Sequence, residues 1–301
     1  MLTVMTGGTR GLGRNAAERL AADAWQSDAD VRPDLVMGAR NSGSVPPGWT
    51  AVPLDLGSLA SVRAFAAALP DGPIARLILN AGGQSPDAAG RTEDGFETTF
   101  ATNHLAHFLL LRLLMPRLAP EARIVITSSG THDPREKTGV PPPRHANARW
   151  LAFPDEEPNG DTSPMVAGMR AYSASKLANL MTARYLAQSE PARAGAWHVF
   201  AYDPGLTPGT GLVRNQPWPI RALVWPLLPL VIPFAKGMNR LSDAGRGLYE
   251  LAATAQAPEG RSYAALRRGA LTWPDPSPLA REDALVTQLW EDSERLVANM
   301  M

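Results

Sequence analysis

Tyr172 and Lys176 form the residue pair in this chain with the clearest potential for chemistry. They lie four residues apart in the stretch 170–186, whose apolar residues recur with helical spacing, so both side chains project from one helix face. A phenol normally gives up its proton near pH ~10, and a neighbouring ammonium group favours phenolate and lowers that pKa. The pair is therefore predicted to exchange the proton of a carbonyl/alcohol couple. An exposed helix with an unrelated tyrosine and lysine is the alternative that this motif alone leaves open.

A glycine-rich turn near the N-terminus predicts a dinucleotide site. The apolar stretch 2–6 reads as a buried strand, the residues GGTRGLG follow at 7–13, and a helical pattern covers 15–24. Glycines allow the backbone to approach a ligand closely, and a helix N-terminus favours the negative charge of a pyrophosphate. The residues expected to contact the cofactor here are Thr6, Gly7, Thr9, Arg10, Gly11, Leu12 and Gly13.

The end of the second strand indicates which dinucleotide is bound. This strand, expected at 34–38, is followed by Ala39 and Arg40, and a second arginine, Arg10, lies in the glycine turn. A site selective for NAD would place an acid at this strand end to hold the ribose 2′-hydroxyl. Two guanidinium groups and no acid suit a 2′-phosphate instead, so NADPH/NADP+ is the predicted cofactor. Two solvated surface arginines are the alternative.

Apolar runs and turn residues divide the rest of the chain into alternating strands and helices. Further strands are expected at 51–56, 74–79, 123–129, 197–202 and 262–266. Further helices are expected at 58–69, 92–118, 170–186, 242–255 and 280–298, with Ser58 and Ser242 as N-caps. Such alternation is typical of an α/β fold with a parallel sheet.

Composition excludes several classes of protein. The 301 residues are 45% apolar, and 29 acidic residues balance 29 basic ones without a basic run, so nucleic acid is not an expected partner. The chain has no cysteine and therefore no disulfide or thiolate metal site. His104 and His107 have no obvious third ligand, so no metal site is expected. The apolar pattern begins at residue 2 and leaves no room for a signal peptide, which predicts a cytoplasmic protein.

Two proline-rich segments interrupt the pattern. Residues 131–169 form a long loop with aromatic residues, interpreted as a partly ordered flap beside the site. Residues 205–240 contain the apolar stretch 217–235 and are interpreted as a lid over a lipophilic substrate. Arg221 and five prolines make this stretch too broken for a transmembrane helix. A dimer contact or a peripheral membrane contact stays open as an alternative.

Seven motifs follow one another in the order typical of the short-chain dehydrogenase/reductase family, which this chain resembles. They are TGGTRGLG at 6–13, Asp55, NAGG at 80–83, NHLAHF at 103–108, ITSS at 126–129, YSASK at 172–176 and DPG at 203–205. The resemblance is closest to the branch of retinol dehydrogenases and light-dependent protochlorophyllide reductases. It implies a single domain over residues 1–301 of the Rossmann type, with a doubly wound, seven-stranded parallel sheet and helices on both faces.

The same resemblance implies roles for individual residues. Tyr172 would exchange the proton, Ser129 rather than Ser128 would hold the reacting carbonyl oxygen, Lys176 would bind the cofactor ribose, and Asn103 would hold a water that links Lys176 to solvent. Tyr172 would also contact the cofactor. Further cofactor contacts are implied for Asp55, Leu56, Asn80, Ala81, Gly82, Pro204, Gly205, Thr207 and Thr210.

The sequence thus predicts an NADP(H)-dependent oxidoreductase that acts on a carbonyl or alcohol group of a small lipophilic substrate. The segment 206–214 also resembles protochlorophyllide reductases and suggests a double-bond reductase, although Leu206 stands where those enzymes carry a cysteine. A non-catalytic NADP(H) sensor is the third reading, which the intact Ser129, Tyr172 and Lys176 oppose. A homodimer or homotetramer through the helices that bear Asn103 and Tyr172 is open, and the long loops could block it.

Overall fold

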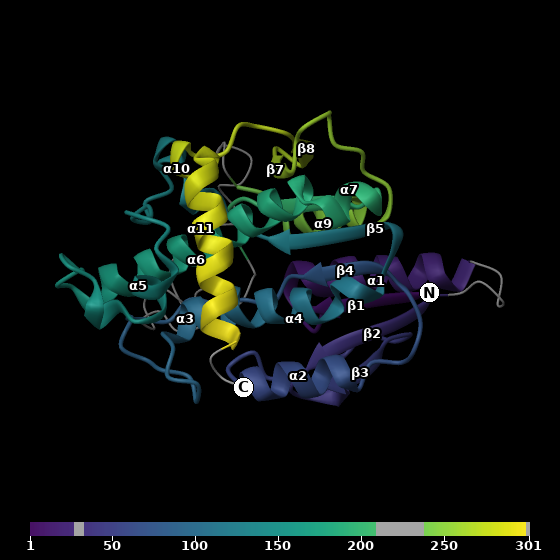
Figure 1. Ribbon diagram of the computed structural model, residues 1–301. Coiled ribbons are helices and arrows are strands. Elements are labelled where there is room, and N and C mark those ends of the chain that lie inside the picture. The colour runs from purple at the N-terminus through teal and green to yellow at the C-terminus, as the bar shows by residue number, and fades with distance from the viewer. Residues whose placement is uncertain (27–32, 209–237, 299–301) are drawn as a thin grey trace.

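A twisted β-sheet with helices on both faces organises the computed structural model, which describes residues 1–26, 33–208 and 238–298 (Figure 1). The strand order is β3-β2-β1-β4-β5-β6-β7-β8. The first seven of these strands are parallel, as predicted, and β8 adds an antiparallel edge. The strands are β1 (Leu2–Thr6), β2 (Asp34–Ala39), β3 (Thr50–Pro53), β4 (Ile74–Leu79), β5 (Leu118–Thr127), β6 (His198–Asp203), β7 (Tyr263–Arg267) and β8 (Ala270–Thr272).

The strand order reverses between β1 and β4, and this reversal locates the site. Chain connections leave β1 and β4 in opposite directions, so a crevice opens at the carboxyl ends of these strands, where open α/β sheets bind ligands. The glycine turn follows β1 and the NAGG segment follows β4, so both reach the crevice.

Two hydrophobic clusters cover the two faces of the sheet. Successive strand side chains point to opposite faces, so Val4 packs in one cluster and Met5 in the other. Helices α1 (Gly11–Gln26) and α9 (Leu241–Ala253) cover the Met5 face. The Val4 face is covered by α2 (Leu59–Ala67), α4 (Ala106–Leu114), α6 (Pro164–Gln188) and α11 (Asp283–Ala298). Shorter helices are α3 (Thr98–Phe100), α5 (Ala148–Ala152), α7 (Glu190–Ala194) and α10 (Pro278–Arg281).

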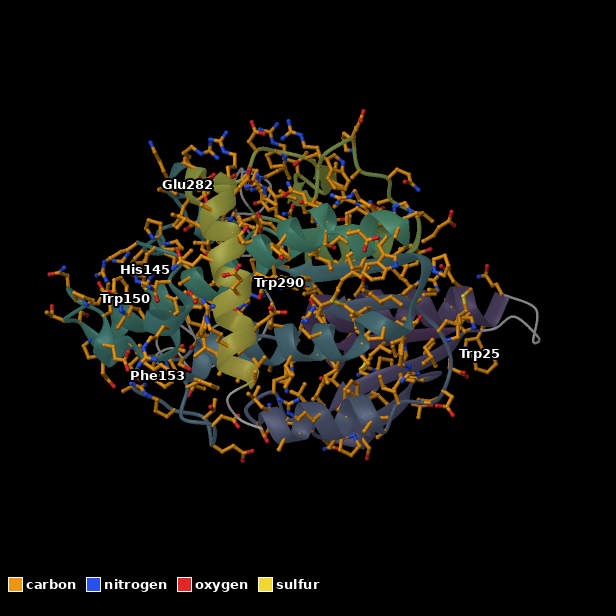
Figure 2. All side chains as sticks on the ribbon, in the orientation of Figure 1. Trp25, His145, Trp150, Phe153, Glu282 and Trp290 are labelled. Carbon is orange, nitrogen blue, oxygen red and sulfur yellow. The ribbon has the colours of Figure 1, made fainter. Side chains whose placement is uncertain are left out.

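Helix α11 crosses over α4 and α6 (Figure 1). Its Trp290, labelled in Figure 2, stacks on Tyr185 of α6 with ring centroids 4.3 Å apart and meets Phe108 of α4 edge-on at 4.9 Å. Ser293 Oγ lies 3.0 Å from Nε2 of the buried His104. An aromatic contact and a buried polar contact thus hold the C-terminal helix on the helices that carry the site.

Two local predictions are wrong. The expected helix 92–118 begins only at Thr98, because Gly95 adopts a φ of 83° and the Glu97 carboxylate accepts hydrogen bonds from the backbone N–H groups of Thr99 and Phe100. It continues through a π-helical turn over 101–105, and the chain enters β5 at residue 118, five residues before the expected strand. Helix α9 begins at Leu241, so Ser242 lies inside it and is not the N-cap.

Among the residues that the structure describes, no helix is long and apolar enough to span a bilayer. The expected lid falls largely on residues 209–237, which lie outside the described ranges, as do Thr210 and the apolar stretch 217–235.

Candidate active site

A cleft of about 890 Å³ lies at the carboxyl ends of the parallel strands. It is lined by Ser129, Tyr172, Lys176 and every expected cofactor contact that the structure describes: Thr6, Gly7, Thr9, Arg10, Gly11, Leu12, Gly13, Arg40, Asp55, Leu56, Asn80, Ala81, Gly82, Pro204, Gly205 and Thr207. Residues from the ends of six strands and from α6 therefore meet around one space.

The glycine turn forms one wall of the cleft and has no room for a side chain at Gly7 or Gly13. Gly7 has a φ of 71°, and a Cβ added there would lie 2.5 Å from the backbone nitrogen of Ala81. A Cβ at Gly13 would lie 2.0 Å from Gly7 O. Asn80 Nδ2 donates to Gly7 O at 2.9 Å, which ties the turn to the end of β4. This backbone surface at the start of α1 fits a pyrophosphate group.

The end of the cleft beside β2 carries positive charge. Strand β2 ends at the buried Ala39, and the exposed Arg40 and Arg10 line the cleft beyond it. Neither arginine forms an ion pair with any residue in the described parts of the chain. Asp55 also lines the cleft, and its Oδ1 accepts a hydrogen bond from Gly57 N at 2.9 Å. A turn contact thus occupies one carboxylate oxygen of Asp55.

Tyr172, Ser129 and Lys176 converge at the other end of the cleft. Tyr172 and Lys176 are 7% and 3% exposed, and Lys176 Nζ lies 5.6 Å from the centroid of the Tyr172 ring. Lys176 Nζ donates to Thr127 O at 3.1 Å, which fixes the ammonium group at the end of β5. A hydrogen-bonding interaction between Ser129 and the Tyr172 phenol contributes to the pKa of the phenol. Ser128 is buried, and its hydroxyl donates to Lys176 O at 2.8 Å.

The prediction that the pKa of Tyr172 is lowered is wrong in this structure. Burial raises the pKa of Tyr172 to about 12, because a low-dielectric surrounding disfavours phenolate. The hydrogen bond to Ser129 lowers the pKa without overcoming burial, and the negative charge of Asp203 raises it further. Burial also lowers the pKa of Lys176 to about 8. At neutral pH the site therefore holds a protonated phenol beside an ammonium group.

Asn103 lies behind the cleft wall and does not line it. Its side chain is bound to Gly83 and Ser175: Oδ1 accepts from Gly83 N at 2.9 Å, and Nδ2 donates to Gly83 O at 2.8 Å and Ser175 Oγ at 3.0 Å. A Cβ added at Gly82 would lie 3.0 Å from Asn103 Oδ1 and 3.3 Å from Lys176 Nζ. The amide thus holds the loop that follows β4 against the lysine, and its role in a proton path stays a prediction.

His104 and His107 are packed inside the protein. His104 contacts Asn179 Oδ1 at 3.3 Å, and His107 Nε2 lies 2.9 Å from Thr6 Oγ1. Burial lowers the pKa values of His104 and His107 to about 4 and about 3, so both rings are neutral at physiological pH. They act as hydrogen-bonding core residues.

Three charged residues of the cleft were not predicted from the sequence as site residues. Asp203 Oδ2 accepts from Arg267 Nη1 at 2.9 Å, and Arg267 Nη2 donates to Glu136 Oε1 at 2.8 Å. All three line the cleft. In the DPG motif only Pro204 and Gly205 were expected to contact the cofactor, and the last strand was expected to end one residue before Arg267. The signal that could have found them is their position, because Asp203 and Arg267 are the last residues of parallel strands.

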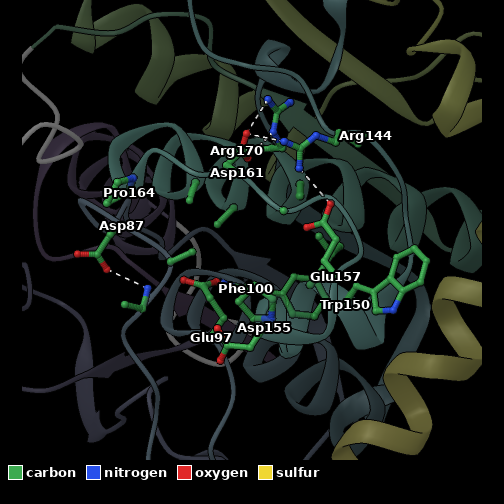
Figure 3. A pocket seen from close by; sticks show the side chains of 18 of the residues that line it. Asp87, Glu97, Phe100, Arg144, Trp150, Asp155, Glu157, Asp161, Pro164 and Arg170 are labelled. Atoms are coloured by element: carbon green, nitrogen blue, oxygen red, sulfur yellow. Dashed lines mark hydrogen bonds and ion pairs between the residues drawn. The ribbon is translucent and has the colours of Figure 1, made fainter.

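The 131–169 segment forms a second, smaller cavity of about 250 Å³ against the start of α6 (Figure 3). The Asp161 carboxylate lies between Arg144 and Arg170 and is hydrogen bonded to both. Arg144 Nη1 also donates to Glu157 Oε1 at 3.0 Å. The ion pair between Asp161 and Arg170 fastens the segment to α6 two residues before Tyr172. Its first part, including Glu136 and residues 137, 138 and 140, lines the main cleft.

Comparison with known proteins places the chain among short-chain dehydrogenases. Residues 2–139 match the family model described as short chain dehydrogenase. Chloroplastic protochlorophyllide reductase A of Triticum aestivum is 30% identical over 314 residues, which cover 98% of this chain and 80% of the relative. Chloroplastic protochlorophyllide reductase B of Hordeum vulgare is 30% identical over 312 residues, which cover 98% of this chain and 78% of that protein.

Solved structures share the same architecture. An uncharacterized protein from Mycobacterium Paratuberculosis is 27% identical, with a TM-score of 0.68 over 99% of this chain and 93% of that chain. A blue fluorescent protein from a metagenomic library, solved in complex with NADPH, has a TM-score of 0.59 at 21% identity, which shows likeness of fold alone. The motifs at the strand ends, the parallel sheet and the near full-length relatives agree: this chain belongs to the short-chain dehydrogenase/reductase family of oxidoreductases.

Proposed function

We propose that the protein is an NADPH-dependent reductase of a lipophilic carbonyl compound. The observation that carries this proposal is the convergence of Ser129, Tyr172 and Lys176 on the cleft that also contains the glycine turn and two arginines. NADPH, when bound, supplies the hydride for the carbonyl carbon. The residues at the two ends of the cleft then have separate tasks, cofactor binding at one end and proton transfer at the other.

The glycine turn and the start of α1 would bind the pyrophosphate, and Arg10 and Arg40 would bind the 2′-phosphate. Lys176, whose ammonium is fixed at the end of β5, would bind the ribose hydroxyls. The geometric support is a backbone-lined turn without space for side chains and a strand end that carries no acid.

Tyr172 would protonate the substrate oxygen as it gains negative charge, and Ser129 would hold the same oxygen by a hydrogen bond. Tyr172, with a pKa of about 12, carries its proton at neutral pH and is therefore available as the acid. Val140, Leu206 and Met238 contribute apolar surface to the cleft, which supports a lipophilic substrate.

The proposal is tested by NADPH consumption with a panel of lipophilic aldehydes, ketones and quinones. We expect NADPH oxidation with at least one member, followed as loss of nicotinamide absorbance. If NADPH binds tightly and no member of a broad panel is reduced, the protein is a nucleotide sensor and the catalytic proposal is wrong.

The two curated relatives favour one second candidate, the reduction of a carbon–carbon double bond in a large ring system. Their names describe protochlorophyllide reductases at 30% identity. Leu206, which lines the cleft, stands where we align a cysteine of those enzymes. Illumination of the protein with NADPH and protochlorophyllide decides between the candidates, because an unchanged absorbance spectrum excludes the second one.

The double variant Arg10→Ser/Arg40→Ser is expected to lose most of its preference for NADPH over NADH. A hydrogen bond to a charged group contributes about 1.5–3 kcal/mol, so loss of one such contact changes the kcat/KM ratio by about 10- to 100-fold. The measurement compares kcat/KM with each cofactor. Arg14→Ser is the matched control, since Arg14 pairs with Glu18 on the exposed side of α1. A wild-type preference for NADH would contradict the assignment.

A further inference from the structure

The carboxylate of Asp203 is a buried charge beside the proposed catalytic residues. Asp203 is only 1% exposed although it lines the cleft. Its Oδ2 accepts from Arg267 Nη1 at 2.9 Å and from Tyr263 Oη at 3.3 Å, and its Oδ1 accepts from Gly205 N at 2.9 Å. Because the desolvation of a buried ion pair often offsets its attraction, such a pair is weak evidence for a stabilising role. A role in the site explains the burial of the Asp203 carboxylate better than a role in stability does.

The strand ends place this carboxylate in the same part of the cleft as Lys176. The lysine ammonium is bound to Thr127 O, and Thr127 pairs with Tyr202, the residue before Asp203. Neighbouring strands lie about 4.8 Å apart. A Cβ added at Gly130 would lie 3.1 Å from Asp203 Oδ2, so the chain that leaves β5 passes directly over the carboxylate. The Lys176 ammonium is therefore held at the end of β5, and the Asp203 carboxylate lies at the end of the adjacent strand β6.

We propose that Asp203 is a positioning residue for the reaction, because its carboxylate, held by Arg267, is the counter-charge that keeps Lys176 in its ammonium form. The inference rests on the proposed function, in which Lys176 acts as a cation beside Tyr172. Arg267 also binds Glu136 at 2.8 Å. The arginine thereby connects the counter-charge to the 131–169 segment.

Lys176 and Asp203 each have ionisable neighbours on the surrounding elements. Lys176 faces Tyr172 on its own helix and His107 on α4, and both are uncharged at neutral pH because burial raises the pKa of the phenol and lowers that of the imidazole. The charge of Asp203 opposes the effect of burial on Lys176. Besides Lys176, the ionisable groups that interact with Asp203 include Arg267, Tyr263, His132, Tyr202 and Tyr172, and Glu136 binds Arg267.

The sign of the pH effect follows from these charges. Burial lowers the pKa of Lys176 to about 8, and Asp203 raises it. The lysine is therefore mostly ammonium at pH 7 and loses its charge as the pH rises through about 8. Without the carboxylate, burial acts unopposed and the charge is lost at lower pH. Activity that requires the ammonium then ends at lower pH as well.

The ionisation of Lys176 can be measured without turnover or cofactor. The chain contains three lysines, Lys137, Lys176 and Lys236, so protein labelled with 13C-lysine gives three Cε signals. The Lys176 signal is identified by its loss in Lys176→Met, and its chemical shift is followed against pH. In Asp203→Asn we expect the midpoint to fall by about one pH unit, the size typical of losing a nearby opposite charge.

Arg267→Met is expected to shift the Lys176 midpoint in the same direction, since a buried carboxylate without its guanidinium favours the neutral acid. Arg267→Lys, which keeps the positive charge, is expected to return the Lys176 midpoint most of the way to the wild-type value. The double variant Asp203→Asn/Arg267→Met is expected to match Asp203→Asn alone. The control is Arg184→Met, which removes a similarly buried arginine that binds Asp283 and Ala280 O on the outer side of α6.

An unchanged Lys176 midpoint in folded Asp203→Asn overturns the inference. If Asp203→Asn does not fold, an unchanged Lys176 midpoint in Arg267→Met overturns the inference. In active enzyme, the alkaline limb of kcat/KM should move with the midpoint, whereas a purely structural role would lower kcat equally at all pH values. A shifted midpoint in a protein that reduces no carbonyl compound would leave the electrostatic inference standing and remove only the proposed function.

Discussion

Replacement of Tyr172 by phenylalanine is expected to lower kcat for carbonyl reduction by about 10²–10⁴-fold, the usual contribution of a positioned general acid. The change removes the phenol hydroxyl and leaves the ring that lines the cleft. NADPH affinity should change by only a few-fold, because the glycine turn and the arginines are untouched. Single-turnover oxidation of NADPH and fluorescence titration of the cofactor measure the two quantities separately.

Tyr185→Phe is the matched control for this variant. Tyr185 lies on the same helix and stacks on Trp290, away from the cleft, so its loss of a hydroxyl should leave kcat unchanged. Near-normal turnover in Tyr172→Phe would remove the phenol from the chemistry. A large loss of NADPH binding in the same variant would show instead that Tyr172 acts mainly in forming the binding site.

Gly7→Ala is expected to weaken both the fold and cofactor binding. The added Cβ would lie 2.5 Å from Ala81 N and 2.6 Å from Ala81 Cα, and these are backbone atoms of the segment after β4 that cannot turn away. The left-handed φ of 71° adds strain of about 1–2 kcal/mol for a residue with a Cβ. Overpacking at a tight site typically costs a further ~1–3 kcal/mol.

Denaturant unfolding measures the free energy of unfolding of Gly7→Ala, and fluorescence titration measures its affinity for NADPH. We expect an affinity loss of about tenfold or more, equivalent to at least ~1.4 kcal/mol, because the turn must move away from β4. Gly160→Ala is the control, since a Cβ there would lie 3.7 Å from its nearest neighbour and the residue lies outside the cofactor cleft. Equal effects of Gly7→Ala and Gly160→Ala on NADPH affinity would contradict a binding role for the glycine turn.

Local sequence was sufficient for the parts of the site that lie close together in the chain. The glycine turn follows from seven consecutive residues between a strand and a helix, and Tyr172 and Lys176 share one helix face because they are four residues apart. The parallel sheet followed from the alternation of strands and helices. The antiparallel β8 was not predicted, because three residues after a tight turn at Arg268 and Gly269 carry little pattern.

The features that the sequence did not reveal depend on tertiary structure. The pKa of Tyr172 was predicted in the wrong direction because burial by distant segments outweighs its local neighbour. The pairing of Asp203 with Arg267 joins residues 64 positions apart, and Glu136 reaches Arg267 from 131 positions away. The late start of the helix at Thr98 depends on Gly95 and on the Glu97 carboxylate, which compete with helical spacing.

The position of α11 bears on how subunits could assemble. Pairing through the two long helices of the site, as the family resemblance suggests, requires their outer sides to be free for a neighbouring molecule. Here α11 packs across α4 and α6, and Trp290 stacks on Tyr185 and meets Phe108 edge-on. We therefore expect self-association, if it occurs, to use a different surface and to leave each cleft complete within a single polypeptide.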